Sequence, residues 1–211
     1  MNALEIRNLT KSYPGFTLDN INLTLPSGCI MGLIGENGAG KSTTIKLILD
    51  MIHKDSGSIT ILGKDNQDNT ELTKEDIGVV LDEVGLPECL TAQQVGNVMK
   101  HTFRNWNDAE YAQLLKKLAL PEQKRFKAFS RGMKMKLGIA IAMSHNSKLL
   151  ILDEATSGLD PVVRDEMISQ ETKAILFSFL RISSVILKNF AIILHSCMRE
   201  NYCFAKKKIN Y

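Results

Sequence analysis

The chain has 211 residues, of which 44% are hydrophobic, and its formal net charge is +3. This length suits one sizeable α/β domain or one domain with a small insert. The first ten residues contain Glu5 and Arg7 and no apolar segment, so we expect no secretory signal there. The four cysteines show no C-x-x-C spacing, so we expect reduced thiols in a cytosolic protein and no cysteine metal site.

The first 51 residues predict three strands and a helix. Alternating apolar side chains predict strands over Ala3–Leu9 and Thr17–Leu25, which we expect to pair in an antiparallel sheet flanking the next strand. The apolar run Cys29–Ile34 predicts a buried strand, and Thr43–Met51 predicts a helix.

Three further strands are predicted at Gly57–Gly63, Ile77–Leu81 and Lys148–Asp153, with a helical insert over about 82–146. Apolar strands that alternate with helices imply a parallel sheet covered on both faces. A later apolar segment, Ala174–Ser178, predicts one more strand.

The insert is predicted to hold three helices. One has an apolar face of Val95, Val98 and Met99, the second has a face at Tyr111, Leu114, Leu115 and Leu118, and the third runs over Met133–Met143. We expect Phe103 and Trp106 to pack within the insert. The histidines are expected in loops or on polar faces, without a catalytic role: His53, His101 and His145.

The segment Gly35–Thr43 matches the phosphate-binding pattern G-x-x-x-x-G-K-[ST]. Glycines let the backbone turn its N–H groups toward phosphate oxygens, and the following helix adds the positive end of its dipole. Lys41 supplies a cation for the outer phosphates, and the Ser42 hydroxyl is a ligand for Mg²⁺. The expected nucleotide contacts in this segment are Gly35, Asn37, Gly38, Ala39, Gly40, Lys41, Ser42 and Thr43.

Two acidic residues, Asp153 and Glu154, stand where the predicted strand Lys148–Asp153 ends. They lie at the strand's carboxyl end, the edge at which α/β sheets bind ligands. Asp153 is expected to hold Mg²⁺ and Glu154 to polarise an attacking water, so both are candidate site residues.

With these motifs in order, the chain resembles the ATP-binding subunits of ABC transporters. The resemblance implies that Tyr13, before the turn Tyr13–Gly15, stacks on adenine, and that Ser157–Asp160 is the D-loop, with Asp160 at the nucleotide. Phe129–Met133 stands at the family's Leu-Ser-Gly-Gly-Gln signature, which touches the γ-phosphate held by a second subunit. The resemblance assigns nucleotide contacts to Ser130, Arg131 and Gly132, although Arg131 and Met133 depart from the consensus.

A second departure lies after the strand Ile77–Leu81. The family places a glutamine there that senses Mg²⁺ and water, whereas this chain has Asp82, which we expect to act in catalysis and in metal binding. Together with the arginine in the signature, this resembles the small ATPases of bacterial ABC-2-type exporters, including those for peptide antibiotics.

The resemblance ends near residue 178. The family then has a switch histidine, but here Phe179, Leu180 and Arg181 follow. Residues 172–211 carry seven basic residues and one acidic residue, a net charge of +6 against −3 for the rest. With allowed synonymous codons, the gene for residues 179–200 could encode, in a shifted reading frame, a segment similar to the family's switch region. We therefore expect a frameshift, and we expect no switch role for His195.

The expected fold is therefore α/β: a P-loop NTPase of the ABC ATPase type, with a parallel sheet core, an antiparallel β subdomain and a helical insert. We expect an ATPase domain over 1–178 and a tail outside the family over 179–211. ATP and Mg²⁺ are the expected cofactors. The expected partners are a second ATPase subunit, identical or not, and an integral-membrane permease on which the insert docks, with no nucleic acid.

The expected place is the cytoplasmic face of the cell membrane. Two alternatives stay open from the sequence alone. One is an ATP-binding remnant with little hydrolysis, because the switch histidine is missing. The other is a soluble ABC ATPase outside transport.

Overall fold

The computed structural model describes residues 1–35, 37–68, 74–81, 84–153, 174–180 and 203–205. The chain divides into two compact units, Met1–Thr73 with Ala174–Tyr211, and Lys74–Lys173. Each unit is described by itself below. No helix in the described ranges is long and apolar enough to cross a membrane.

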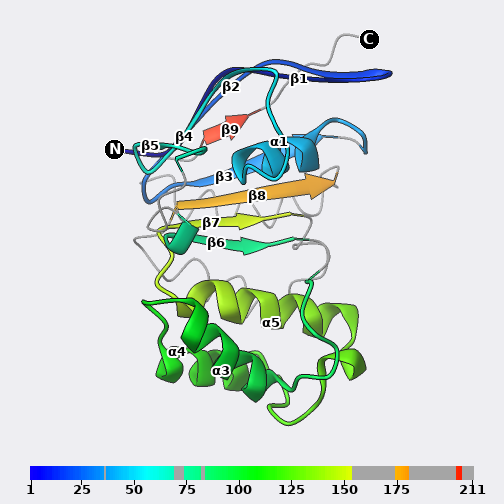
Figure 1. The fold of residues 1–211 in the computed structure, drawn as a ribbon, viewed down its shortest axis with the longest axis vertical. Coiled ribbons are helices and arrows are strands. Elements are labelled where there is room, and N and C mark those ends of the chain that lie inside the picture. The colour runs from blue at the N-terminus through cyan, green and yellow to red at the C-terminus, as the bar shows by residue number, and fades with distance from the viewer. Residues whose placement is uncertain (36, 69–73, 82–83, 154–173, 181–202, 206–211) are drawn as a thin grey trace. The chain divides into compact units, whose positions relative to one another are not determined.

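The first unit contains an antiparallel sheet of four strands. These are β1 (Asn2–Tyr13), β2 (Phe16–Pro26), β4 (Ser56–Ile61) and β5 (Lys64–Asp65), in the order β2-β1-β4-β5. Figure 1 shows β1 and β2 as the long blue ribbons of this sheet. Alternation buries one face, including Leu4, Ile6 and Leu25, which confirms the antiparallel pairing expected from the sequence.

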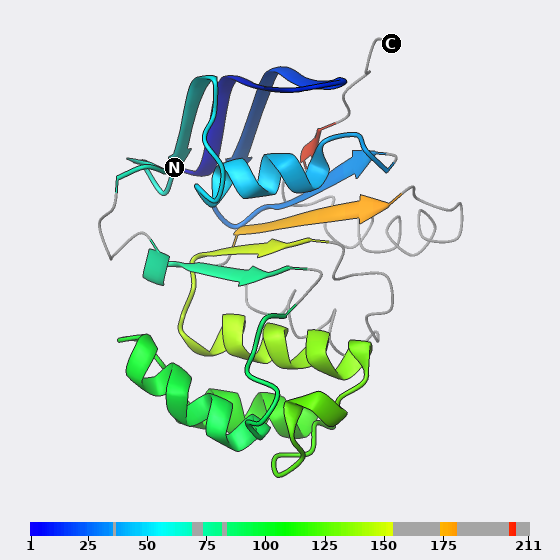
Figure 2. The same ribbon diagram turned by 45° about the vertical axis from the view of Figure 1, so that its right-hand side comes forward.

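Parallel strands form the rest of the first unit. β3 (Ile30–Gly35) pairs in parallel with β8 (Ala174–Leu180) and with β9 (Cys203–Ala205). The strand predicted at 174–178 is confirmed and continues two residues further, to Leu180. In Figure 2 the helix α1 (Lys41–Ile48) lies alongside β3, to which the loop from Gly35 joins it.

The second unit pairs β6 (Ile77–Val80) with β7 (Leu149–Leu152) in parallel. The helix α5 (Arg131–Ser144) packs against β6. Gly78 permits this close approach, because a Cβ there would lie 2.7 Å from the carbonyl oxygen of Ala142. With the parallel pairing in the first unit, these strands confirm the predicted α/β class.

The remaining elements of this unit are α3 (Ala92–Thr102) and α4 (Asp108–Lys117), both labelled in Figure 1, and the 3₁₀ turn η1 (Phe126–Ala128). The helices α3, α4 and α5 each begin at a side chain that caps them: Thr91, Asn107 and Ser130. The predicted buried face at Tyr111, Leu114, Leu115 and Leu118 is confirmed, since each is at most 5% exposed.

Two details of the sequence prediction are wrong. Helix α1 spans Lys41–Ile48 rather than 43–51, because Gly40, at φ 86°, is itself the N-cap. Val95 is buried as predicted, but Val98 is 49% exposed, because α3 buries Ala92 and Gly96 together with Val95.

His145 lies in the turn after α5, as expected of a loop histidine, yet it is only 1% exposed. Its ring stacks on Phe103 with centroids 4.0 Å apart, and Nδ1 lies 3.0 Å from the carbonyl oxygen of Glu75. A satisfied imidazole of this kind tolerates burial. Phe103 and Trp106 do pack within the insert as expected, since the Trp106 ring lies 4.9 Å from that of Tyr111.

Candidate nucleotide-binding site

The phosphate loop joins the end of β3 to the start of α1. Gly38 and Gly40 adopt φ values of 82° and 86°, a region that side chains with a Cβ rarely occupy. Gly35 is constrained by space instead, because a Cβ there would lie 2.9 Å from the Cβ of Ala39. The glycines at these positions therefore follow from the backbone path, and a tight loop ends at a helix N-terminus.

Lys41 is buried in this loop, with only 9% of its surface exposed. Its Nζ donates a hydrogen bond to the carbonyl oxygen of Gly35 at 2.8 Å. A buried ammonium is costly unless polar groups surround it, so the loop holds a cation in position for an anionic ligand. Thr44 ties the helix to the loop, because its Oγ1 and its backbone nitrogen both donate to the carbonyl oxygen of Gly40, at 2.9 and 2.8 Å.

The other predicted loop residues face solvent to different degrees. Asn37 and Gly38 are exposed, and Ala39, Ser42 and Thr43 are half-buried. The first turn of α1 presents backbone N–H groups that have no partner inside the helix. Phosphate oxygens suit such donors, and the hydroxyl of Ser42 is of the kind that Mg²⁺ accepts, so these residues fit ATP with Mg²⁺.

Tyr13 lies at the end of the β1–β2 hairpin, which packs against the phosphate loop. It is opposite Phe16 in the strand register and is 42% exposed. A Cβ on Gly40 would lie 2.9 Å from Cζ of Phe16 and 2.9 Å from Cδ1 of Leu18. The hairpin therefore brings an exposed aromatic ring close to the loop, as stacking on a nucleotide base requires.

The sequence did not identify Phe16 and Leu18 as supports of the loop. Both lie on one face of β2, two residues apart, which is a signal for burial. The residue that they contact was not evident from the sequence, because Gly40 carries no side chain.

In the second unit, Asp153 follows β7 and is 7% exposed. Its backbone nitrogen donates to the carbonyl oxygen of Val80 at 2.9 Å. The strand before it is fully apolar and buried, which places this carboxylate at the carboxyl end of two parallel strands. A carboxylate at such an edge is a suitable ligand for Mg²⁺.

Ser130 caps α5, since its Oγ accepts a hydrogen bond from the backbone nitrogen of Met133 at 3.3 Å. Arg131 and Gly132 are exposed in the first turn, which contains no acidic residue. An acid is the usual choice at this position of a helix, so the basic first turn favours an anionic partner.

The first unit thus brings together Tyr13 and the residues of the phosphate loop, while Asp153 and Ser130–Gly132 belong to the second unit. Glu154, Asp82 and Asp160 lie outside the described residues, as does His195. Among the described residues, no group of three or more His, Cys, Asp or Glu side chains could hold a metal ion by itself.

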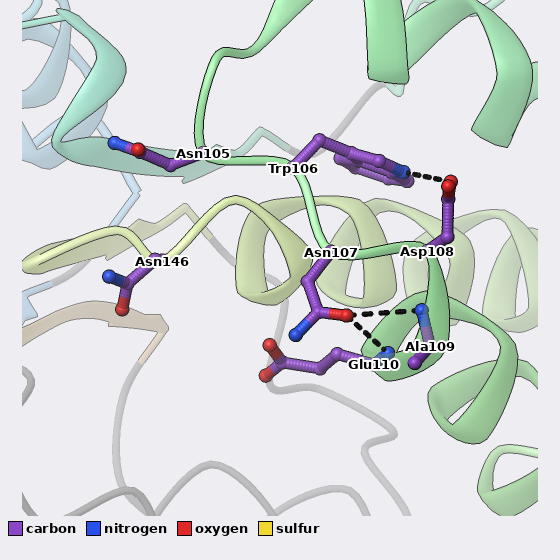
Figure 3. Close-up of a pocket in the computed structure, with 7 residues that line it drawn as sticks. All are labelled: Asn105, Trp106, Asn107, Asp108, Ala109, Glu110 and Asn146. Carbon is purple, nitrogen blue, oxygen red and sulfur yellow. Dashed lines mark hydrogen bonds between the residues drawn. The ribbon is translucent and has the colours of Figure 1, made fainter.

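A polar hollow of about 540 Å³ lies at the start of α4 (Figure 3). Asn107 Oδ1 accepts hydrogen bonds from the backbone nitrogens of Ala109 and Glu110, at 3.0 and 3.1 Å. Trp106 Nε1 donates to Asp108 Oδ1 at 3.0 Å. None of the predicted nucleotide contacts lines this hollow.

Comparison with known proteins identifies the family. Residues 18–157 match the family model described as ABC transporter. The chain is 41% identical over 167 residues to the lantibiotic transport ATP-binding protein SrtF of Streptococcus pyogenes, covering 78% of this chain and 71% of that protein. It is 35% identical over 163 residues to the bacitracin transport ATP-binding protein BcrA of Enterococcus faecalis, covering 76% of this chain and 53% of that protein.

A solved structure described as the ATP-binding subunit of an ABC transporter superposes with a TM-score of 0.75 at 26% identity, covering 96% of this chain and 85% of that one. A putative ABC transporter ATP-binding protein from Pyrococcus furiosus shares the fold, with a TM-score of 0.72 at 22% identity, covering 86% of this chain and 92% of that one. The relatives carry transport names, which does not favour the remnant or the soluble non-transport ATPase. The chain belongs to the ABC transporter family, as an ATP-binding subunit whose ATPase activity powers transport.

Proposed function

We propose that this chain hydrolyses ATP at the inner face of the cell membrane and drives export of a peptide antibiotic through a separate permease. The main support for an ATP site is that Lys41 is buried in a loop against which the β1–β2 hairpin, with Tyr13 at its end, packs. The export of a peptide is supported by relatives named for lantibiotic and bacitracin transport.

In this proposal the base stacks on Tyr13 and the phosphates lie in the loop Gly35–Thr43. Lys41 and the backbone N–H groups offset the charge that develops on the transferred phosphoryl group. Ser42, Asp153 and Asp82 are the proposed ligands of Mg²⁺, which would supply further charge stabilisation. Glu154 is the proposed base that orients the attacking water.

The proposed working form pairs two ATPase subunits, identical or not, each with its loop facing the other's signature segment. Ser130, Arg131, Gly132 and Asp160 are the residues assigned to that shared site. The basic first turn of α5 supports this assignment, because it suits the phosphates of a partner's nucleotide. The helical insert is the proposed contact with the permease.

Phosphate release by the purified chain with Mg²⁺ and ATP tests the catalytic part. We expect turnover in the unaltered protein, and we expect Glu154→Gln to keep ATP binding while losing about 10²-fold or more in turnover. ATP binding without turnover in the unaltered protein would contradict the proposal. Co-purification of a membrane protein with the tagged chain tests the transport part.

We also propose that residues 1–178 form the ATPase domain and that residues 179–211 are a frameshifted tail. The nucleotide sequence around codon 178 tests this directly. An open alternate frame that encodes the switch histidine is the expected result, and a closed frame would refute the idea.

A further inference from the structure

We propose that Lys11 and Asp55 position the ring of Tyr13 for the nucleotide base. They are therefore positioning residues of the ATP site, which act through Tyr13. The inference rests on the proposed function, in which Tyr13 stacks on adenine. We call Lys11, Ser12, Tyr13 and Asp55 the Tyr13 cluster.

Lys11 and Tyr13 lie two residues apart on β1, so their side chains project from the same face of the strand. Lys11 Nζ lies over the Tyr13 ring, 5.5 Å from its centroid. This is within the range in which an ammonium attracts the face of an aromatic ring. The ring of Tyr13 therefore has a defined partner before any nucleotide arrives.

Asp55 holds Lys11 in that position. Its Oδ1 accepts a hydrogen bond from Lys11 Nζ at 2.7 Å, and its Oδ2 accepts one from the backbone nitrogen of Ser12 at 2.7 Å. The backbone nitrogen of Asp55 also donates to the carbonyl oxygen of Thr10 at 3.0 Å. One residue thus fixes three successive positions of β1 directly before Tyr13.

The hydrogen bond from Lys11, followed by that from Ser12, holds the pKa of Asp55 below its usual value. The carboxylate therefore stays charged at neutral pH. The side chain of Lys11 is only 19% exposed, so the ammonium is restricted rather than freely solvated.

Asp55 directly precedes β4, in the segment that follows α1. It thereby connects the chain after the phosphate-loop helix to the strand that carries Tyr13. A half-exposed tyrosine otherwise samples several rotamers, and ordering it before binding lowers the entropic cost of stacking on a base. The cluster therefore affects the affinity for the base part of ATP and leaves the phosphate part unchanged.

The test compares the affinities of purified variants for ATP and for tripolyphosphate, which has the phosphates but no base. Lys11→Met removes the ammonium, and Asp55→Asn keeps an acceptor for Ser12 while removing the charge that holds Lys11. We expect each to weaken ATP binding about two- to fivefold and to leave tripolyphosphate binding unchanged. Lys11→Arg, which preserves the pair and the cation, should bind ATP like the unaltered protein.

Arg7→Met is the matched control, because it removes a different ion pair on the same strand, that of Arg7 with Glu5 at 2.6 Å. It should change neither affinity. Unchanged ATP affinity in both Lys11→Met and Asp55→Asn would overturn the inference. Equal weakening of ATP and tripolyphosphate would also overturn it, since that result marks a general disturbance of the loop.

Tyr13→Ala separates this inference from the proposed function. If that variant binds ATP and tripolyphosphate as the unaltered protein does, then Tyr13 has no role at the base. The proposed stacking of Tyr13 and the positioning role of Lys11 and Asp55 then both fail. If it weakens ATP alone while the Lys11 and Asp55 variants do not, only the positioning role fails.

Discussion

Phe16 lies so close to Gly40 that a Cβ on the glycine would come within 2.9 Å of Cζ of the ring. Gly40 also has φ of 86°, so any other residue there is strained as well as crowded. The phosphate loop is therefore shaped from two sides, by its own backbone and by the hairpin packed on it.

Gly40→Ala is expected to destabilise the protein by about 2–5 kcal/mol, which combines left-handed strain with overpacking. Gly38→Ala is the matched control, because Gly38 has φ of 82° but nothing within 4 Å of a built Cβ. It should cost only the strain, about 1–2 kcal/mol. Urea unfolding of both variants measures the difference, and equal costs would show that Phe16 and Leu18 do not constrain the loop.

Lys41→Met is expected to lower ATP turnover by at least about 10²-fold, because it removes the cation assigned to the phosphates. The hydrogen bond to the carbonyl oxygen of Gly35 is lost with it. Lys46→Met is the control, since Lys46 is an exposed lysine on the same helix. Phosphate-release assays and ATP titrations check both variants. Similar turnover in the two would contradict the role of Lys41.

The phosphate loop was predictable from the sequence because its pattern is fixed by backbone geometry that only glycine allows. The buried strand before Asp153 was also predictable, because all its residues are apolar. The contacts between elements were not predictable in this way. Val98 continued the helical period of α3, yet the helix turns its small residues inward because the ring of Tyr111 packs where Gly96 has no side chain.

His145 illustrates the same limit for polar residues. Its type and its position at the end of α5 indicate exposure. It is buried because two residues distant in sequence contact it. Phe103 stacks on its ring, and the carbonyl oxygen of Glu75 lies within hydrogen-bond distance of its Nδ1. The Tyr13 cluster likewise joins residues from two segments of the chain, and sequence spacing alone could not bring Asp55 to Lys11.

Asn66 secures the other end of the phosphate-loop helix. Its Nδ2 donates to the carbonyl oxygens of Leu47 and Ile48, at 2.8 and 3.2 Å, in the last turn of the helix. The carbonyl oxygen of Leu47 also accepts from the backbone nitrogen of Asp50 at 3.2 Å. Asn66→Ala should therefore cost about 1–3 kcal/mol in unfolding free energy. Gln67→Ala, at the neighbouring position, removes only solvent-exposed hydrogen bonds with Lys54 and Asp50 and should cost less than about 0.5 kcal/mol. A cost for Asn66→Ala no larger than that of Gln67→Ala would show that the two hydrogen bonds do not stabilise α1.

Tyr111 gives a prediction for alkaline pH. Its hydroxyl donates to the carbonyl oxygen of Ala92 at 2.8 Å, and burial, with a smaller contribution from Glu122, raises the pKa of the phenol well above its usual value. The folded state therefore keeps its proton where the unfolded state loses it, above about pH 10. Stability from this group is fully present below that pH and falls as the pH rises toward the folded pKa.

Tyr111→Phe should cost about 1–2 kcal/mol at pH 7, because the buried hydrogen bond to the carbonyl oxygen of Ala92 is lost. Above about pH 10 the deficit should shrink, since only the unaltered protein loses stability through this phenol, by up to about 1.4 kcal/mol per pH unit. Urea unfolding of both proteins from pH 7 to 11 measures the difference, which cancels the titration of the other groups. A deficit that stays constant across this range would mean that Tyr111 titrates alike in the folded and unfolded states.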